Sequence, residues 1–207
     1  MVNATKRYRG AIIVVDVQND FCPGGSLPVP NGNEVISALN AVLELAQQLD
    51  VLVFASRDWH PAETSHFADF GGVWPTHCVQ DTEGAAFHPD LHLPATAHVL
   101  SKGTLKDEDA YSAFQGHEEQ GDDGLSLAEI LKTEGVETVW IGGLATDYCV
   151  KATALDAVRN GFTTVLLVDA CRAVDIHEGD GDRALEEMAQ AGVKLMRTFI
   201  DNSQEVK

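Results

Sequence analysis

The chain has 207 residues, 44% hydrophobic and 22% charged, which is typical of a globular protein with a substantial core. Its formal net charge of −18, from 32 acidic and 14 basic residues, argues against nucleic acid or an anionic membrane surface as a partner. No window approaches ~18 consecutive apolar residues, and the first stretch, "MVNATKRYRG", lacks the features of a secretory signal peptide, so we expect neither a membrane span nor export.

Apolar runs rich in β-branched residues predict about six strands. These runs lie at 11–16, 51–56, 97–101, 137–143, 163–169 and 193–198. Segments with apolar residues at helical spacing lie between most of them, at 33–48, 126–134, 148–160 and 181–190. Near-continuous apolar strands that alternate with helices indicate a parallel sheet covered on both faces. We therefore predict an open three-layer α/β fold.

One segment does not follow this alternation. Residues 57–96 lack clear periodicity and are too long for a plain connection between two elements. We interpret this segment as a functional insertion within a single domain that spans residues 1–207. The sequence shows no internal repeat and no low-complexity tract that would divide the chain.

Chemically useful side chains follow four of the predicted strands. Asp16 ends the first strand, Asp58 and His60 follow the second, Lys102 follows the third and Cys149 follows the fourth. In open α/β sheets, ligands bind beyond the carboxyl ends of the strands. We therefore expect these side chains to meet at one edge of the sheet.

Cys149 has two interpretations. A free cysteine is most often a small buried apolar residue. Cys149, however, lies where a helix is predicted to begin, and unpaired backbone N–H groups and the helix dipole there would stabilise a thiolate and lower its pKa. The preceding "GGLATD" allows a sharp turn whose amides could face an oxyanion. Position alone leaves both interpretations open.

The other cysteines bear on the cellular compartment. Cys22, Cys78, Cys149 and Cys171 are widely spaced, and no C-x-x-C pair occurs. Without a secretory signal, this spacing predicts reduced thiols in a cytoplasmic protein rather than a disulfide framework.

Asp16 and Lys102 each have an ordinary alternative, because aspartate often caps a turn and most lysines are solvated. Beside a thiol they acquire a joint role. A carboxylate accepts the thiol proton and returns it to a leaving amine, first as general base and then as general acid. A neighbouring ammonium favours both the carboxylate and the thiolate through charge attraction.

A metal site is predicted within residues 58–77. Three imidazoles and one carboxylate occur in about twenty residues that lack periodic packing: Asp58, His60, His66 and His77. A lone histidine is usually a surface or core residue, but this set suits a divalent transition metal ion such as zinc, iron or manganese. The nearby aromatic residues Phe21, Trp59 and Trp74 could belong to the core or could wall a flat substrate.

Five blocks of the sequence together resemble a known family. They read "IIVVDVQNDFCPGGSL", "SRDWHPAETSHF", "WPTHCVQDTEGAAFHPDL", "SKG" and "GGLATDYCVKATALDAVRNGF". In order and over roughly residues 10–190, they resemble the nicotinamidase/pyrazinamidase branch of the isochorismatase-like cysteine hydrolases. The resemblance implies a three-layer α/β/α sandwich, Rossmann-like, with a six-stranded parallel sheet.

The resemblance also implies an activity, metal-assisted hydrolysis of nicotinamide to nicotinate and ammonia through a cysteine thioester. Pyrazinamide would be accepted too, and the activity would serve NAD salvage. Cys149 would be the nucleophile, Asp16 the general acid and base, and Lys102 the third member of the triad. Asp58, His60, His66 and His77 would hold one metal ion, which would bind the pyridine nitrogen of the substrate.

Further site residues follow from the same resemblance. A cis peptide bond is implied before Ala145, and the amides of Ala145 and Cys149 would form an oxyanion hole. Phe21, Leu27 and Trp74 match substrate-contacting positions, and we place Tyr111 near the pocket mouth. The partner would be a small-molecule amide, and the oligomeric state, monomer or homo-oligomer, stays open. The loop at 103–124 is longer and more acidic than in compact members, and its role also stays open.

Three rival functions remain at this point. The first is another member of the same superfamily, an amidase acting on N-carbamoyl compounds or an isochorismatase, whose vinyl-ether hydrolysis requires no thiol. The second is a metallohydrolase in which metal-bound water attacks and Cys149 is structural. The third is a binding module without catalysis, against which the Asp16, Lys102 and Cys149 set argues.

Overall fold

The computed structural model of the protein describes residues 9–118 and 125–198. Within these residues, seven strands form one sheet in the order β4-β3-β2-β1-β5-β6-β7. The strands are β1 (Gly10–Val15), β2 (Leu52–Asp58), β3 (His98–Lys102), β4 (His117–Glu118), β5 (Thr138–Leu144), β6 (Thr163–Arg172) and β7 (Lys194–Met196). All six predicted strands are present, and the α/β fold with a mostly parallel sheet is confirmed.

The prediction of a six-stranded, wholly parallel sheet is wrong in one detail. The strand that was not predicted is β4. It pairs antiparallel with β3, where Leu100 lies opposite Glu118 and Ser101 opposite His117. A strand of two residues is too short to produce an alternating pattern, so periodicity does not detect it. It belongs to the acidic loop at 103–124, of which residues 119–124 lie outside the described part of the chain.

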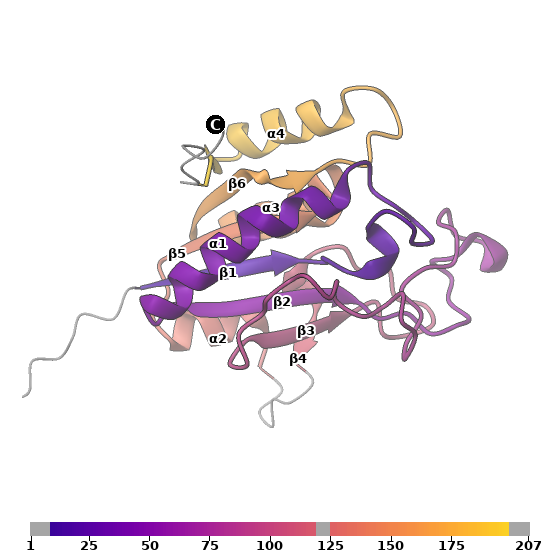
Figure 1. Cartoon of the computed structure of the whole chain (residues 1–207), viewed down its shortest axis with the longest axis horizontal. Coiled ribbons are helices and arrows are strands. Elements are labelled where there is room, and N and C mark those ends of the chain that lie inside the picture. The colour runs from indigo at the N-terminus through magenta and orange to yellow at the C-terminus, as the bar shows by residue number, and fades with distance from the viewer. Residues whose placement is uncertain (1–8, 119–124, 199–207) are drawn as a thin grey trace, which may run out of the picture.

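In the described part of the chain, four α-helices cover the sheet and complete three layers (Figure 1). They are α1 (Val35–Gln48), α2 (Leu127–Thr133), α3 (Lys151–Arg159) and α4 (Asp180–Gln190). Alternate residues of β1 point to opposite faces: Ile12 packs in the cluster that contains α1, and Ile13 packs with α2, α3 and α4. Burial on both faces explains why the strand reads as a continuous apolar run.

The predicted helix at 148–160 has a different beginning from the one expected. Residues Thr146–Val150 form a single turn of π-helix, and the regular α-helix α3 starts only at Lys151. The Val150 N–H donates to the Ala145 carbonyl over 3.1 Å and closes the wider turn. Apolar spacing cannot separate this turn from an α-helix, although π-turns are frequent at functional sites.

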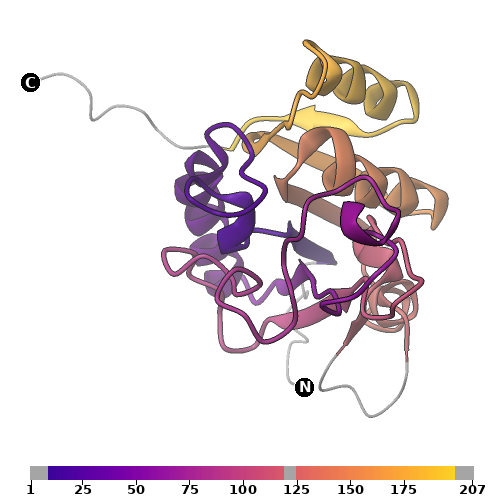
Figure 2. The same ribbon diagram turned by 90° about the vertical axis from the view of Figure 1, so that its right-hand side faces the viewer.

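The parallel strands all direct their carboxyl ends to one edge of the molecule. In Figure 1 the carboxyl ends of β1, β2 and β3 lie on the right, together with the loop that follows β2, and Figure 2 looks directly at this edge. The loop between β2 and β3 includes a short 3-10 helix at Ala68–Phe70 and is joined to itself by isolated bridges between His60 and Val79 and between Phe67 and Trp74. The segment at 57–96, predicted as an insertion, therefore lies at the edge where the strands have their carboxyl ends.

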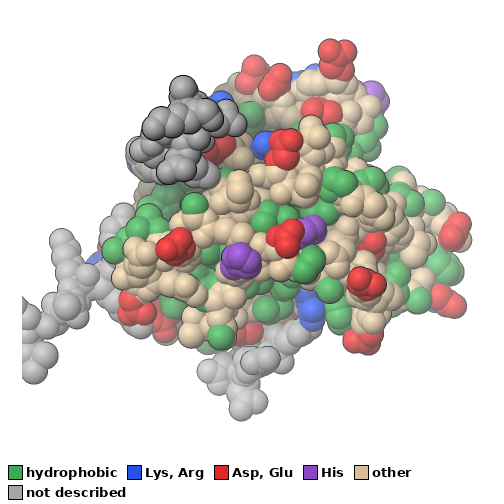
Figure 3. Space-filling model, viewed as in Figure 1, with side chains coloured by type: hydrophobic (Ala, Val, Ile, Leu, Met, Phe, Trp, Pro, Cys, Tyr) green, Lys and Arg blue, Asp and Glu red, His purple; other side chains and the backbone are tan. Residues whose placement is uncertain are grey.

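The surface matches the acidic composition. On the face shown in Figure 3, acidic side chains are scattered widely and few lysines or arginines lie between them. Within residues 9–118 and 125–198, no helix combines the length and apolar character needed to cross a membrane.

Candidate active site

The register of the sheet brings three of the predicted site residues together. Asp58 and Lys102 end β2 and β3 and are paired across these strands. Asp16 follows β1, and its N–H donates to the Ser56 carbonyl of β2 over 3.1 Å. Because the three strands are adjacent and parallel, residues about 40 positions apart in the sequence reach one point.

Lys102 is the centre of a buried charge cluster. Its Nζ lies 2.9 Å from Asp16 Oδ2 and 3.5 Å from Cys149 Sγ, and it forms an ion pair with Asp58 Oδ1. Lys102 and Asp16 are fully buried. Burial alone would lower the pKa of Lys102, but the carboxylates of Asp16 and Asp58 outweigh it and hold that pKa well above its ordinary value. The lysine is therefore a fixed positive charge between two carboxylates and a thiol.

Asp16 is oriented by a second hydrogen bond. The Ser56 hydroxyl donates to Asp16 Oδ1 over 2.7 Å. Burial raises the pKa of the Asp16 carboxyl above its ordinary value, and Asp58 adds to the rise, whereas Lys102 and Ser56 oppose it. A carboxylate whose pKa is moved towards neutrality is better suited to take and return a proton near neutral pH.

The expectation of a lowered pKa at Cys149 is wrong for the free protein. Burial raises the pKa of the thiol well above its ordinary value, Asp16 and Asp58 raise it further, and Lys102 acts in the opposite direction. The cysteine is 7% exposed and lies in the π-turn before α3. The thiol is therefore protonated at rest, and its proton must leave when the sulfur attacks.

The turn that carries Cys149 depends on close packing of two backbones. Gly143, near the end of β5, has φ = 132°, and a Cβ atom there would overlap the carbonyl oxygen of Val15. Only glycine permits this approach of β5 to β1. The peptide bond between Leu144 and Ala145 is cis, as the sequence resemblance implies. Ala145 and Cys149 both line the same pocket.

The predicted metal ligands also meet. Ligand atoms of His60, His66 and His77 all lie within 4.8 Å of one another. Asp58 Oδ2 lies 3.6 Å from His60 Nε2 and 3.8 Å from His77 Nε2. Burial by itself would raise the pKa of Asp58, but Lys102 and His60 outweigh it and hold the pKa below its ordinary value. Asp58 therefore connects the charge cluster to the histidine cluster.

Each histidine of this cluster is oriented through Nδ1. The acceptors are Gly103 O for His60 at 3.0 Å, Asp109 Oδ1 for His66 at 2.7 Å and Pro75 O for His77 at 2.7 Å. A carbonyl or a carboxylate only accepts, so Nδ1 carries the hydrogen and Nε2 keeps a lone pair. This is the arrangement in which metal-binding histidines are usually held.

Two further observations fit a metal ion. His60 Nε2 is buried and has no hydrogen-bond partner among the described residues, an arrangement that is costly unless something else binds it. Burial lowers the pKa of His77 to about 4 and lowers that of His66 as well, so both rings are neutral at pH 7. Neutral imidazoles with a carboxylate suit a divalent transition metal.

Gly103 is required at its position. It has φ = 63°, and a Cβ atom there would overlap the ring of His60. A side chain would therefore push away the carbonyl that orients His60. The glycine of the "SKG" block thus contributes to the histidine cluster through its backbone.

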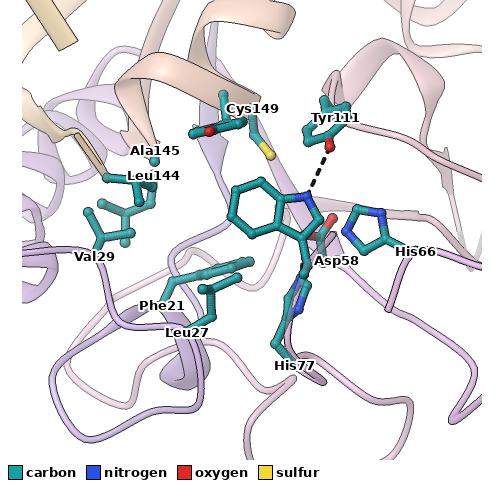
Figure 4. A pocket seen from close by; sticks show the side chains of 13 residues that line it. Phe21, Leu27, Val29, Asp58, His66, His77, Tyr111, Leu144, Ala145 and Cys149 are labelled. Carbon is teal, nitrogen blue, oxygen red and sulfur yellow. Dashed lines mark hydrogen bonds and ion pairs between the residues drawn. The ribbon is translucent and has the colours of Figure 1, made fainter. Parts of the chain in front are cut away.

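A pocket opens between the two clusters (Figure 4). All four residues predicted to contact a substrate line it: Phe21, Leu27, Trp74 and Tyr111. In Figure 4, Phe21 and Leu27 lie on one side of the cavity, and the Cys149 sulfur points into it. Trp74 Nε1 donates to the Tyr111 hydroxyl over 3.0 Å, which fixes two of the aromatic walls.

Sequence reasoning missed several residues of the site. Three of them orient site residues that were predicted. Ser56 orients Asp16, Gln18 orients Asp58, and Asp109 orients His66. The side chain of Gln18 donates to the Asp58 carbonyl over 2.7 Å and accepts from the Asp58 N–H over 2.8 Å. The signal for Gln18 is its place two residues after Asp16 in one block. Four pocket-lining residues were also missed: Val29, Leu144, Tyr148 and Val174.

The chain is similar to several known proteins in sequence and fold. A family model described as the isochorismatase domain matches residues 10–199. The nicotinamidase of Escherichia coli (strain K12) is 40% identical over 202 residues, which cover 89% of this chain and 93% of that protein. The nicotinamidase/pyrazinamidase of Mycobacterium tuberculosis (strain ATCC 25618 / H37Rv) is 43% identical over 189 residues, which cover 90% and 97%. The crystal structure of the pyrazinamidase of Pyrococcus horikoshii in complex with zinc is 45% identical, with a TM-score of 0.82, and covers 92% of this chain and 99% of that one.

Proposed function

The chain belongs to the isochorismatase-domain family, and on that premise we propose that it is a nicotinamidase. It hydrolyses nicotinamide to nicotinate and ammonia, and pyrazinamide to pyrazinoate and ammonia, an activity that serves NAD salvage. The observation that carries this proposal is the buried contact of Lys102 with Asp16 and Cys149, beside a cluster of three histidines. A carboxylate, an ammonium and a thiol in contact suit acyl transfer from an amide.

The proposed reaction begins at Cys149. Its thiol proton passes to Asp16 as the sulfur attacks the amide carbon, and the amide oxygen becomes an oxyanion. The N–H groups of Ala145 and Cys149 would donate to that oxyanion, as the family resemblance implies. Asp16 then gives its proton to the amide nitrogen, the C–N bond breaks, and ammonia leaves a thioester on Cys149.

The second half regenerates the enzyme. Asp16, now a carboxylate again, takes a proton from a water molecule that attacks the thioester carbon. The C–S bond breaks, the sulfur recovers the proton from Asp16, and the carboxylic acid product leaves. Lys102 keeps its proton throughout, and its positive charge favours the anionic forms of Asp16 and Cys149.

We further propose that Asp58, His60, His66 and His77 hold a divalent transition metal ion, with zinc, iron and manganese as the candidates. When bound, the ion supplies a Lewis-acid site for the ring nitrogen of the substrate. The chain's own residues do the remaining positioning: Phe21, Leu27, Trp74 and Tyr111 enclose a flat ring beside Cys149.

Ammonia release across a panel of substrates tests the proposed function. We expect release from nicotinamide and pyrazinamide and none from an N-carbamoyl amine, because the pocket has aromatic walls beside the histidine cluster. Treatment with a chelator should lower the rate at least ~10²-fold, and zinc, iron or manganese should restore it. Release from the N-carbamoyl compound alone, or full activity in the metal-free protein, would contradict the proposal.

The Ser56→Ala variant tests the role of Asp16 as the base. The Ser56 hydroxyl favours the ionised carboxylate and lowers the pKa of Asp16, so its removal should raise that pKa further. The acidic limb of the kcat/KM profile should therefore move to higher pH. The matched control is Ser101→Ala, a buried serine of β3 that accepts from Arg57 Nε, which should leave the limb in place. An unmoved limb in Ser56→Ala would argue against Asp16 as the titrating base.

Two broader statements are also proposals. We propose that residues 1–207 form a single hydrolase domain in which 57–96 is the insertion that supplies metal ligands, since strands from β1 to β7 share one sheet. We propose a cytoplasmic location, since all four cysteines are free thiols.

A further inference from the structure

The first part of the acidic loop, residues 103–111, is attached directly to the segment that carries the histidines. Gly103 O accepts from His60 Nδ1, and Asp109 Oδ1 accepts from His66 Nδ1. Between them, the Lys106 carbonyl accepts from the Ser65 N–H over 2.8 Å and from the Thr64 hydroxyl over 3.0 Å. This part of the loop therefore forms a wall of the histidine cluster.

Asp109 differs from the other two acceptors in this cluster. His60 and His77 are oriented by backbone carbonyls, whereas His66 is oriented by a side chain that carries a charge. The side chain of His66 is 4% exposed, and that of Asp109 is 63% exposed. The carboxylate therefore reaches from the solvent-exposed rim to a buried ring.

The ring of His66 is held by a hydrogen bond to Asp109 and by stacking on the rings of His60 and Trp74. His66 lies in the loop after β2, eight residues beyond Asp58 and outside any strand or helix, and its carbonyl accepts from the Trp74 N–H over 3.4 Å. Its N–H donates to the Thr64 hydroxyl over 3.3 Å, which is a long hydrogen bond. The 2.7 Å contact with Asp109 is the short one, and because it occupies Nδ1 it leaves the lone pair of Nε2 for a ligand.

We propose that Asp109 is a positioning residue that sets the affinity of this site for its divalent metal ion by orienting His66. The inference rests on the metal site of the proposed function and assigns a role to the acidic loop. A carboxylate on Nδ1 fixes the tautomer and the ring direction and makes Nε2 a stronger donor. If the Asp109 carboxylate is removed, the ring of His66 can turn away from His60 and His77.

The overall negative charge of the protein is an alternative explanation for any effect of Asp109 on metal affinity. A variant at a neighbouring residue distinguishes this explanation from the orientation of His66. A chain with net charge −18 attracts any cation, so removal of any carboxylate lowers metal affinity slightly. Asp107 lies in the same loop and is exposed, so Asp107→Asn removes the same charge two residues away without touching His66. It is the matched control.

The experiment is a zinc titration of the metal-free full-length proteins in competition with a chromophoric chelator. We expect Asp109→Ala to raise the zinc Kd by about 10- to 100-fold. Asp109→Asn should raise it less, because the amide oxygen still accepts the hydrogen bond. Asp107→Asn should stay within about twofold of the wild type. Thermal unfolding of the metal-free variants checks that each one is folded.

A double-mutant comparison with His66→Ala ties the effect to one contact. In that background Asp109→Ala should change the zinc Kd no further. The proposal is overturned if Asp109→Ala binds zinc like the wild type, if Asp107→Asn weakens binding equally, or if the loss persists without His66. A wild-type protein that binds no zinc, iron or manganese would instead overturn the metal site of the proposed function.

Discussion

Replacing Cys149 with alanine is expected to lower the rate of ammonia release from nicotinamide by roughly 10⁴-fold or more. Its sulfur points into the pocket, 3.5 Å from Lys102 Nζ, and it is the cysteine that lines this pocket within the described residues. In the proposed mechanism, no thioester forms without this sulfur. Metal content, measured by elemental analysis, should stay near that of the wild type, because the histidine cluster is built from other residues.

The control for this prediction is Cys171→Ala. Cys171 is a buried thiol of β6 outside the pocket, and burial raises its pKa to about 12, so its loss should leave the activity near that of the wild type. Rapid acid quenching of the wild-type reaction should trap a nicotinoyl group on Cys149, detected by peptide mass spectrometry. Substantial activity in Cys149→Ala, or after complete alkylation of Cys149, would favour attack by metal-bound water instead.

Lys102→Met is expected to have the largest effect on stability. Lys102 separates Asp16 from Asp58, and all three side chains are buried, so in the metal-free protein its removal leaves two buried carboxylates without their ammonium partner. Breaking a buried ion pair from one side lowers the free energy of unfolding by about 3–5 kcal/mol. Urea unfolding measures the loss. Lys106→Met, which removes an exposed ion pair with Glu63, should cost about 1 kcal/mol or less.

The decrease in the free energy of unfolding caused by Lys102→Met should depend on pH. Without the ammonium, the pKa of at least one of the two carboxyls rises above its unfolded value, so the folded state binds a proton more tightly than the unfolded state. Stability then increases as the pH falls through that raised pKa. Part of the deficit at pH 7 should therefore be recovered at pH 5. A deficit that is the same at both pH values would show that packing, rather than charge, explains the loss.

The position of the candidate site was predictable because the fold rule that places it is simple. Apolar runs identify the strands, and parallel strands deliver their final residues to one edge. This rule alone predicts that the site contains Asp16, Asp58, Lys102 and Cys149. No side-chain contact has to be known for that prediction. The long, aperiodic segment after β2 likewise indicated where three histidines would gather.

Other features of the site have no local pattern. The hydrogen bond from His66 to Asp109 joins residues 43 positions apart, and nothing beside either residue announces the other. The two-residue strand β4 and the π-turn before α3 are shorter than the windows in which periodicity is detectable.

By itself, the sequence determined the α/β class, the approximate positions of six strands and the residue types at the candidate site, since these depend on hydrophobic periodicity and side-chain identity. Only the tertiary structure decided the ionisation of those residues. The start of a helix predicted a lowered pKa at Cys149, but burial raises it, with two carboxylates acting in the same direction. Desolvation and long-range charge depend on what surrounds a group in space, and a linear sequence does not specify those surroundings.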